Sequence, residues 1–493
     1  MPINAEKKQF YKTCEIKITS KNEVSTKLEL TEEEATSVII ENAIPFLEIE
    51  ECGTSEVRYG GKVYFTVVTG LNGVKKTEAG VEFMYKEQAQ KVNAGDLVIG
   101  DATVDNVKVT VKNGIVTASA VLIYTATVYQ KQEESYLYSL EGANVKKAEV
   151  NSLLFPTKYK SNFTVENEFE VPFVIADVLY HEERVKLTSV SAGIGSVIIE
   201  GEVELSMLIK THEGGLVRHV KCLPMRYEGD ASDVLPSSII SVCACVKGAN
   251  LSVTSYEQTS KSTVSAFVNV GFSGLIYEVE QLRFISDAYS IKNELILDKK
   301  EYKTTEITGV KCTAVKAETQ GSLKIKENAG LICPLFVKIE SVETSETPSG
   351  LNLNGVASAT VIISNEGVFE TVKVPVNYST RLEESCLVKN VTPCNLEASV
   401  SGGKISVTFD LNLTLVSTEN KATYALFEVQ EGEERPVNDS AISICVPKES
   451  DTLWDLCKSL GALEEEVLKL NPELNFPLTG DERVVIYREI NKE

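Results

Sequence analysis

Gly201-Glu-Val-Glu-Leu-Ser-Met-Leu208 is the stretch that decides the fold class, because the chain uses the same pattern three times. Gly61-Lys-Val-Tyr-Phe-Thr-Val-Val68 and Gly355-Val-Ala-Ser-Ala-Thr-Val-Ile362 are the other two copies, and in each a glycine leads into an alternating apolar and polar run. Alternation with a period of two, in segments rich in Val, Ile, Thr and Tyr, is typical of antiparallel strands with one buried face. The sequence therefore predicts a mainly β protein.

A turn and a return strand follow each of these glycine-led runs. Glycine at such turns supplies the positive φ that a tight β-hairpin requires. A second hairpin recurs further along, across Asn113-Gly114 in the first copy and across Gly402-Gly403 in the third. The turns expected after the glycine-led runs are Leu71-Asn-Gly73, His212-Glu-Gly-Gly215 and Asn365-Glu-Gly367.

The spacing of the copies sets the expected domain organisation. The three glycines lie 140 and 154 positions apart (201−61 and 355−201). Self-similarity at a fixed period is the mark of a repeat architecture. We predict three repeated antiparallel β units, like sandwiches or barrels, followed by a charged linker and a small C-terminal domain. The expected boundaries are 1–145, 146–300 and 301–430 for the β units, 431–440 for the linker and 441–490 for the domain.

The charge balance limits the classes of partner. The chain has 493 residues, with 49 Lys and Arg against 71 Asp and Glu, which gives a formal net charge of −22. Such a surface repels phosphate backbones, so we expect no nucleic-acid partner. The N-terminus has no apolar segment typical of a secretory signal, and no run reaches the roughly 20 apolar residues that cross a bilayer, so membrane insertion is not expected. The acidity suits a basic protein partner, or serves only solubility.

Residues that commonly carry catalysis or bind metals are scattered. The eleven cysteines mostly lie in apolar strand-like runs, which is typical of small buried side chains in a reducing compartment. Cys243 and Cys245 alternate along one such run without further ligands nearby, so no metal site is expected. The three histidines form no metalloprotease motif, and neither a nucleophile elbow nor a phosphate-binding loop occurs. We therefore expect no cofactor and no enzymatic activity, with a β-rich hydrolase as the remaining alternative.

Residues 441–490 have a different texture, which predicts a β-α-α-β module. Alternation over 442–446 and the apolar run 484–487 indicate an opening strand and a closing strand. Between them lie two short amphipathic segments with helix-start and helix-stop residues at their ends. The residues expected at these ends are Asp451 or Thr452 as the first N-cap, Gly461 after the first helix, Leu463 at the start of the second and Pro472 after it.

This module resembles the LysM domain family. The resemblance lies in Asp451-Thr-Leu-Trp454 at the first helix and in Leu470-Asn-Pro472 after the second. LysM domains bind N-acetylglucosamine glycans in a groove between the loops that flank the two helices. Ser450 stands where the family has a glycine, which puts a close backbone approach to sugar in doubt. The resemblance implies a binding groove, for a glycan or a protein, of Asp451, Thr452, Leu453, Trp454, Asn471 and Pro472. Trp454, the single tryptophan, is either a core residue or a binding anchor.

Acidic β repeats that end in one LysM-like module resemble the SipL-like spore-coat morphogenetic proteins, whose repeats are called SPOCS domains. Phe284-Ile-Ser-Asp-Ala-Tyr-Ser290 and Glu482-Arg-Val-Val-Ile-Tyr-Arg488 are local features that support this resemblance. It implies a non-enzymatic scaffold in the mother-cell cytoplasm at the forespore surface, and later in the spore coat. Its LysM domain would tether the chain to the coat ATPase SpoIVA, beside other coat proteins. The alternative is a peptidoglycan-binding protein of the spore or cell envelope.

Overall fold

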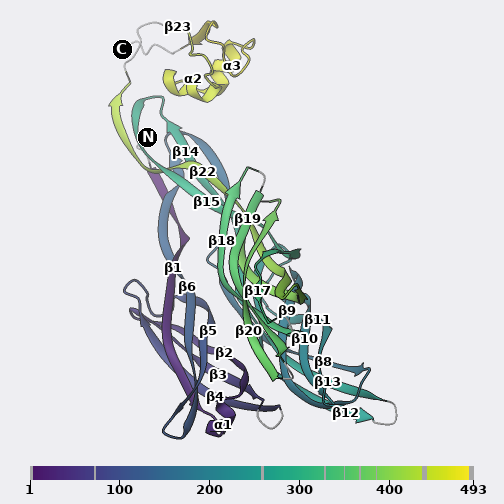
Figure 1. The fold of residues 1–493 in the computed structure, drawn as a ribbon. Helices are drawn as coiled ribbons and strands as arrows, with labels where there is room; N and C mark the ends of the chain where they lie inside the picture. The colour runs from purple at the N-terminus through teal and green to yellow at the C-terminus, as the bar shows by residue number, and fades with distance from the viewer. Residues whose placement is uncertain are drawn as a thin grey trace.

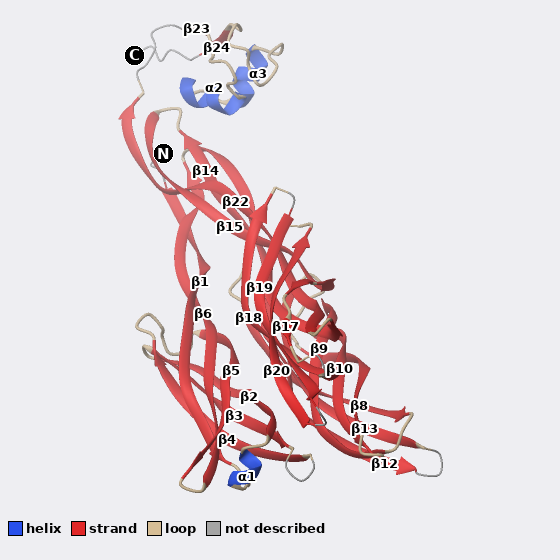
Figure 2. Ribbon diagram, viewed as in Figure 1, coloured by secondary structure: helices blue, strands red, loops and turns tan. Residues whose placement is uncertain are grey.

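The computed structural model describes residues 4–70, 74–256, 260–326, 329–348, 350–365, 368–384, 386–435 and 441–487. Within them the chain is mainly β, and every strand pairing is antiparallel, as predicted (Figure 2). Three helices occur in the described part, and two of them belong to the C-terminal module. No helix among these residues has the length and apolar character needed to cross a membrane.

The described strands between Asn4 and Glu141 form two three-stranded sheets. In one sheet, β2, β3 and β4 follow one another as a meander; in the other, the last strand β6 lies between β5 and the first strand β1 (Figure 1). The elements are β1 (Asn4–Lys27), α1 (Glu32–Ala35), β2 (Val38–Gly53), β3 (Glu56–Thr69), β4 (Lys75–Gln88), β5 (Leu97–Lys112) and β6 (Ile115–Glu141).

The same pairing order occurs in the next stretch of the chain, where β9, β10 and β11 form the meander and β13 lies between β12 and β8. Two further strands, β7 and β14, pair with each other as a separate ribbon. The elements are β7 (Asn144–Leu153), β8 (Thr157–Val171), β9 (Ile175–Ala192), β10 (Ser196–Thr211), β11 (Leu216–Asp230), β12 (Ile239–Tyr256), β13 (Lys261–Tyr277) and β14 (Val279–Tyr289).

A third copy of this order follows, with β18, β19 and β20 as the meander and β22 between β15 and β21. We call the three sets of strands the first, second and third unit; the exact domain boundaries remain a prediction. The elements of the third unit are β15 (Asn293–Lys316), β16 (Glu318–Gln320), β17 (Leu323–Lys324), β18 (Gly330–Thr347), β19 (Gly350–Asn365), β20 (Val368–Leu382), β21 (Leu387–Ser401) and β22 (Lys404–Glu434).

The repeated glycines have a common structural reason. Gly61, Gly201 and Gly355 lie in the central strands β3, β10 and β19, and at each one the preceding strand contains a β-bulge. A Cβ on any of the three would overlap a backbone carbonyl oxygen of the bulged strand. Glycine is therefore required here by the close approach of two backbones, because any side chain would push the bulge away.

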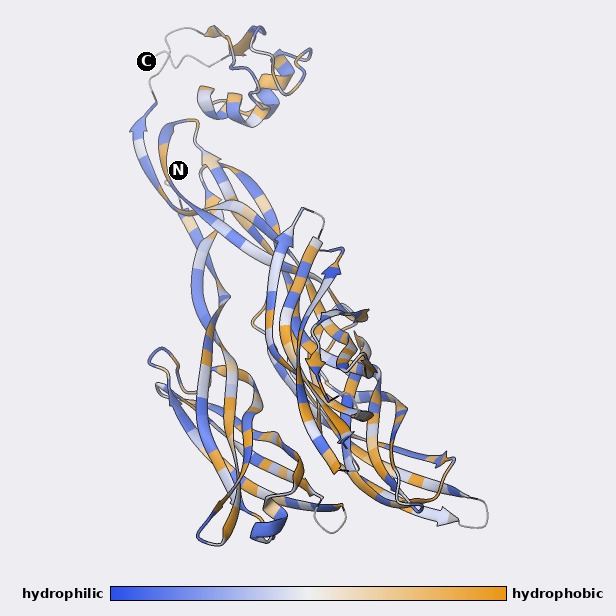
Figure 3. Ribbon diagram, viewed as in Figure 1, coloured by the Kyte–Doolittle hydropathy of each residue, from blue (hydrophilic) through white to orange (hydrophobic). Residues whose placement is uncertain are grey.

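Both sheets of a unit contribute to a single hydrophobic core, and apolar and polar residues alternate along the strands (Figure 3). In the first unit the rings of Tyr59 on β3 and Tyr124 on β6 stack at 3.9 Å between centroids and are both buried. In the third unit Tyr378 on β20 meets Phe409 on β22 edge to face. Aromatic pairs of this kind join the two sheets across the core.

In the first and third units the long first and last strands continue beyond the paired sheets as two-stranded ribbons, and β7 with β14 forms a third ribbon. These ribbons pack on one another around the ring of Phe10, which meets Tyr302 edge to face at 4.9 Å and Tyr136 at 5.6 Å. We call this set the ribbon cluster; its buried members are Phe10, Tyr136, Val150, Leu282, Phe284 and Ala425. Since each unit supplies residues to it, the ribbon cluster ties together parts of the chain that are far apart in sequence.

The second hairpins form where the sequence predicted them. Asn113 and Gly114 have φ values of 53° and 77°, and Gly402 and Gly403 have 55° and 69°, as a tight two-residue turn requires. The turn at 212–215 joins β10 to β11. The predicted turns at 71–73 and 366–367 lie outside the described residues. Thr31 caps α1, a single turn that leads into β2.

The C-terminal β-α-α-β segment is present, with the predicted helix ends. It consists of β23 (Ile442–Cys445), α2 (Leu453–Leu460), α3 (Glu464–Leu470) and β24 (Val484–Tyr487). Residues 431–434, which the sequence analysis assigned to the linker, instead extend β22, because they pair with the start of β15. A run of charged residues on an exposed ribbon looks like a linker in the sequence, because neither has the regularly spaced apolar residues of a buried face.

We predict that Gly201→Ala destabilises the second unit by about 1–3 kcal/mol, because the new Cβ must displace the bulge of β9. The midpoint of urea unfolding, followed by circular dichroism, measures this effect. Gly309→Ala in β15 is the matched control, since its Cβ would meet nothing within 4 Å. Equal shifts for the two variants would contradict the role of the glycine.

Candidate functional site

The start of α2 is fixed by a capping box. The Thr452 side chain accepts a hydrogen bond from Asp455 N, and the Asp455 carboxylate accepts one from Thr452 N at 3.1 Å. The hydrogen bonds from Thr452 lower the pKa of Asp455. Gly461 ends the helix in the left-handed conformation, with φ 63°. Of the two predicted N-caps, Thr452 holds the position, because its hydroxyl reaches the free backbone amides of the first turn.

Asp451 belongs to the loop before the helix. Its carboxylate accepts a hydrogen bond from Lys448 N at 2.9 Å. Its carbonyl accepts one from Leu478 N at 2.9 Å, while Ser450 N donates to Leu478 O at 2.8 Å. The two loops expected to flank a ligand groove are thus joined to each other through their backbones.

Ser450, which replaces the family's glycine, has a φ of 71°. This left-handed conformation costs a residue with a side chain about 1–2 kcal/mol, whereas glycine adopts it freely. The loop therefore keeps the backbone shape that a glycine would favour, with the serine under strain.

Asn471 is buried and acts inside the module. Its amide nitrogen donates to Val467 O at 2.8 Å and to Val485 O at 2.7 Å, and its amide oxygen accepts from Val485 N at 2.7 Å. These bonds link the end of α3 to β24, which explains the asparagine as a structural residue. Pro472 follows directly and is exposed.

Trp454 lies against the second unit. Its indole N–H donates to the Asp287 carboxylate at 2.8 Å, and its ring meets Tyr289 edge to face at 4.9 Å. Both partners belong to β14. The Tyr289 hydroxyl donates to Ala462 O at 2.9 Å and is buried with the core of the module. The tryptophan is therefore partly buried in an internal contact between the module and β14.

Asp287 is the centre of this contact. Besides Trp454, it accepts hydrogen bonds from Lys458 Nζ at 2.6 Å and forms an ion pair with Lys299 Nζ at 2.8 Å. Burial alone would raise the pKa of Asp287, but the bonds from Lys299, Lys458 and Trp454 outweigh it and lower this pKa to about 2. A charged, multiply bonded carboxylate thus connects the module to the ribbons.

The module also has an apolar surface that the sequence analysis did not single out. The side chains at 442, 444 and 446 alternate as predicted, but they point away from the helices and are 64%, 64% and 67% exposed. Tyr487 pairs with Ile442 across the two strands and is 53% exposed. We call Ile442, Ile444, Val446 and Tyr487 the hairpin face. Alternation shows that one face of a strand is apolar, but not which face the protein covers.

Of the six predicted site residues, the structure brings Asp451, Thr452 and Leu453 together at the start of α2. Leu453 packs on the core of the module. The remaining three are divided between the β14 contact, the interior and the exposed loop. Asp287 and Tyr289 were not predicted as site residues, although both lie in the stretch 284–290 that supports the family resemblance.

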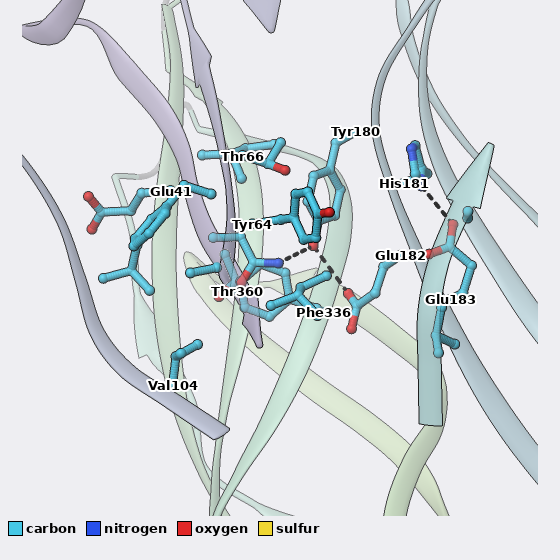
Figure 4. A pocket seen from close by; sticks show the side chains of 18 of the residues that line it. Glu41, Tyr64, Thr66, Val104, Tyr180, His181, Glu182, Glu183, Phe336 and Thr360 are labelled. Atoms are coloured by element: carbon cyan, nitrogen blue, oxygen red, sulfur yellow. Dashed lines mark hydrogen bonds and ion pairs between the residues drawn. The ribbon is translucent and has the colours of Figure 1, made fainter. Parts of the chain in front are cut away.

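A second candidate site is a cavity of about 1710 Å³ that is lined by strands of all three units (Figure 4). Tyr180 on β9 accepts a hydrogen bond from Asn42 Nδ2 on β2 at 3.0 Å, which joins the second unit to the first. His181 Nδ1 lies 2.6 Å from the Glu183 carboxylate near the same wall. In the described residues no cluster of His, Cys, Asp and Glu has the arrangement of a metal site.

The cysteines are all free in the structure. Cys333, Cys386, Cys394 and Cys457 are buried, as expected for small apolar side chains, whereas Cys222 and Cys245 are exposed. Burial raises the pKa of Cys333, Cys394 and Cys457 to about 12, which keeps these thiols protonated.

Comparison with known proteins gave no family model, no curated protein and no solved structure that matches this chain.

We predict that Asp287→Asn loosens the module from β14 by about 1–2 kcal/mol, because it removes the anion that two lysines share. Trp454 is the only tryptophan, so its fluorescence should shift to longer wavelength as the indole meets water. Asp298→Asn, at an exposed position of β15, is the matched control.

The same contact should depend on pH. Since its pKa falls from 3.8 to about 2 in the folded chain, the stabilisation by Asp287 is complete above about pH 4 and is lost as the pH falls toward 2. In Asp287→Asn, the change in Trp454 fluorescence that accompanies this loss of stabilisation between about pH 4 and pH 2 should be absent. An identical acid transition in both proteins would contradict the role of Asp287.

We predict that Ser450→Gly stabilises the module by about 0.5–1 kcal/mol, because it relieves the strain of a positive φ. The thermal midpoint of the Trp454 fluorescence change measures it. Glu449→Gly, at the preceding residue with an ordinary φ, should give no gain, so a gain of equal size there would rule out the explanation.

Proposed function

We propose that this chain is a non-enzymatic scaffold of spore-coat assembly, of the SipL-like kind. In this proposal the three units are copies of one SPOCS-like β-sandwich, and the C-terminal segment is a LysM-like module. The observation that carries it is the combination in one chain of a strand order used three times with a β-α-α-β module that begins its first helix with Asp451-Thr-Leu-Trp454. The chain would act in the mother-cell cytoplasm at the forespore surface and later in the coat.

The proposed partner of the module is a coat ATPase like SpoIVA, in a complex with other coat proteins. The hairpin face supports a protein partner, because apolar side chains that are more than half exposed and lie together are typical of interaction surfaces. The joined loops support it too, since Ser450 and Asp451 already bond to Leu478 across the expected sugar groove.

Peptidoglycan is the second candidate ligand, and one observation favours it. Ser450 preserves the left-handed backbone of the family's glycine, so the loop retains the shape that approaches sugar in LysM domains.

The test is a pull-down of the SpoIVA-like ATPase with the full chain and with Ile444→Asp, which puts a charge in the middle of the hairpin face. We expect the substitution to reduce capture at least about tenfold, because a carboxylate must then be desolvated in an apolar contact. Removal of residues 436–493 should abolish capture.

Val368→Asp is the matched control, since Val368 is 61% exposed and lies on β20 of the third unit. Capture of the ATPase by the shortened chain at the full level would refute the proposed tether. Sedimentation of the intact chain with purified peptidoglycan, without capture of the ATPase, would favour the second candidate.

A further inference from the structure

At two junctions a cation at an equivalent position donates to a backbone carbonyl of the neighbouring unit. Arg184 on β9 of the second unit donates to Pro393 O on β21 of the third at 3.0 Å. Lys338 on β18 of the third unit donates to Val104 O on β5 of the first at 2.8 Å. The two cations lie 154 positions apart, which is the spacing of the repeat itself.

The two acceptor carbonyls are also equivalent. Val104 and Pro393 each lie two residues before an asparagine with positive φ, Asn106 at 50° and Asn395 at 51°. Each asparagine sits in a β-bulge of its strand. A cation from one unit therefore reaches the carbonyl beside the bulge of the next unit, and this contact closes the junction.

The third junction, between the first and second units, has no cation at the equivalent position. Lys158 and Lys160 on β8 bridge it instead, donating to Val98 O at 2.7 Å and to Glu48 O at 2.9 Å. The residue 140 positions before Arg184 is Ile44 on β2, whose side chain offers no hydrogen-bond donor and is 36% exposed. The bulge of β12, between Val246 and Gly248, lines the same space. This space is part of the cavity of about 1710 Å³, whose lining also includes Arg184, Pro393, Val104 and Lys338 of the other two junctions.

This cavity contains an aromatic platform. The ring of Tyr64 lies over Gly80 on the neighbouring strand, where a Cβ would come 3.3 Å from its Cε1 atom. Phe46 supports the ring edge to face at 5.4 Å, and Tyr64 remains 46% exposed toward the cavity (Figure 4). An exposed ring face attracts a Lys or Arg side chain through the cation–π interaction.

The charges of the cavity lining also favour a positively charged ligand. Eight carboxylates face five Lys and Arg side chains, a net charge of −3. Glu41 and Asp101 form no ion pair with another described residue, and burial raises the pKa of both. A cation beside either carboxylate would favour its charged form and would itself be attracted into the cavity.

We infer that this cavity is a docking site for an extended basic segment of a partner protein, which supplies the Lys or Arg that position 44 lacks. The volume exceeds the roughly 300–1,000 Å³ of small-molecule sites, which favours a polypeptide. A second copy of this chain is disfavoured as the occupant because its net charge is −22. The site is separate from the C-terminal module and does not depend on the function proposed for it.

The test uses the full chain and a fluorescein-labelled peptide of 12 residues in which Arg and Thr alternate, with binding measured by anisotropy at fixed salt. We expect Tyr64→Ala to weaken binding about fivefold or more, and the pair Glu41→Gln with Asp101→Asn to weaken it about tenfold or more. Ile44→Arg should also weaken binding, because it places in the chain itself the cation that the bound segment would supply.

Matched controls separate the site from the general acidity of the chain. Tyr424→Ala removes a tyrosine that is 57% exposed on β22, and Glu166→Gln with Glu168→Gln removes two exposed carboxylates from β8. Each control should change affinity less than about twofold. Circular dichroism checks that every variant is folded. If Tyr64→Ala is unfolded, the cavity variant Glu41→Gln with Asp101→Asn decides the outcome.

Three results would overturn the inference. The first is an absence of binding by the Arg-Thr peptide. The second is equal weakening by the controls and the cavity variants, which would indicate attraction to the acidic surface alone. The third is equal affinity for a peptide in which Glu replaces Arg.

Discussion

Backbone pairing between the first and last strands of each unit is the constraint on which the rest of the structure depends. β1 pairs with β6 from Asn4 to Lys27, and β15 pairs with β22 from Asn293 to Lys316. These ladders join residues 90 to 141 positions apart (117−27 and 434−293), so a unit closes only when its last strand has returned to its first. The same strands then continue as the ribbons. One set of hydrogen bonds therefore fixes both the sheets and the position of the ribbon cluster.

The positions of the bulges and turns follow from this closure. A central strand must curve to cover the core, and each meander curves where a bulge meets a glycine at 61, 201 or 355. Because the bulge brings one backbone onto another, the glycine is fixed more strictly than any apolar residue of the core. This is why the glycine-led runs are visible in the sequence while the core residues between them vary in kind.

Local chemistry could be predicted from the sequence, because it depends on neighbouring residues. The caps at Thr452 and Gly461 and the turn at Asn113-Gly114 belong to this class. Contacts between distant residues could not be predicted. The spacing of Trp454 along its helix is the same whether its side chain faces the core of the module or β14. Only the folded chain brings Asp287 to its indole. Likewise, the alternation over 442–446 does not reveal that these residues face solvent, and the cavity exists only because three units meet.

The three units pack on one another through equivalent apolar surfaces, which limits how the number of units can change. A second cluster, with Val68, Leu208 and Ile362 among its members, joins the meanders of the three units at positions related by the repeat. In a solenoid each repeat touches only its neighbours, so repeats can be added or lost at an end. Here every unit contributes to the same two clusters. The loss of one unit would expose apolar surface of the other two, so we expect the three units to be kept or lost together.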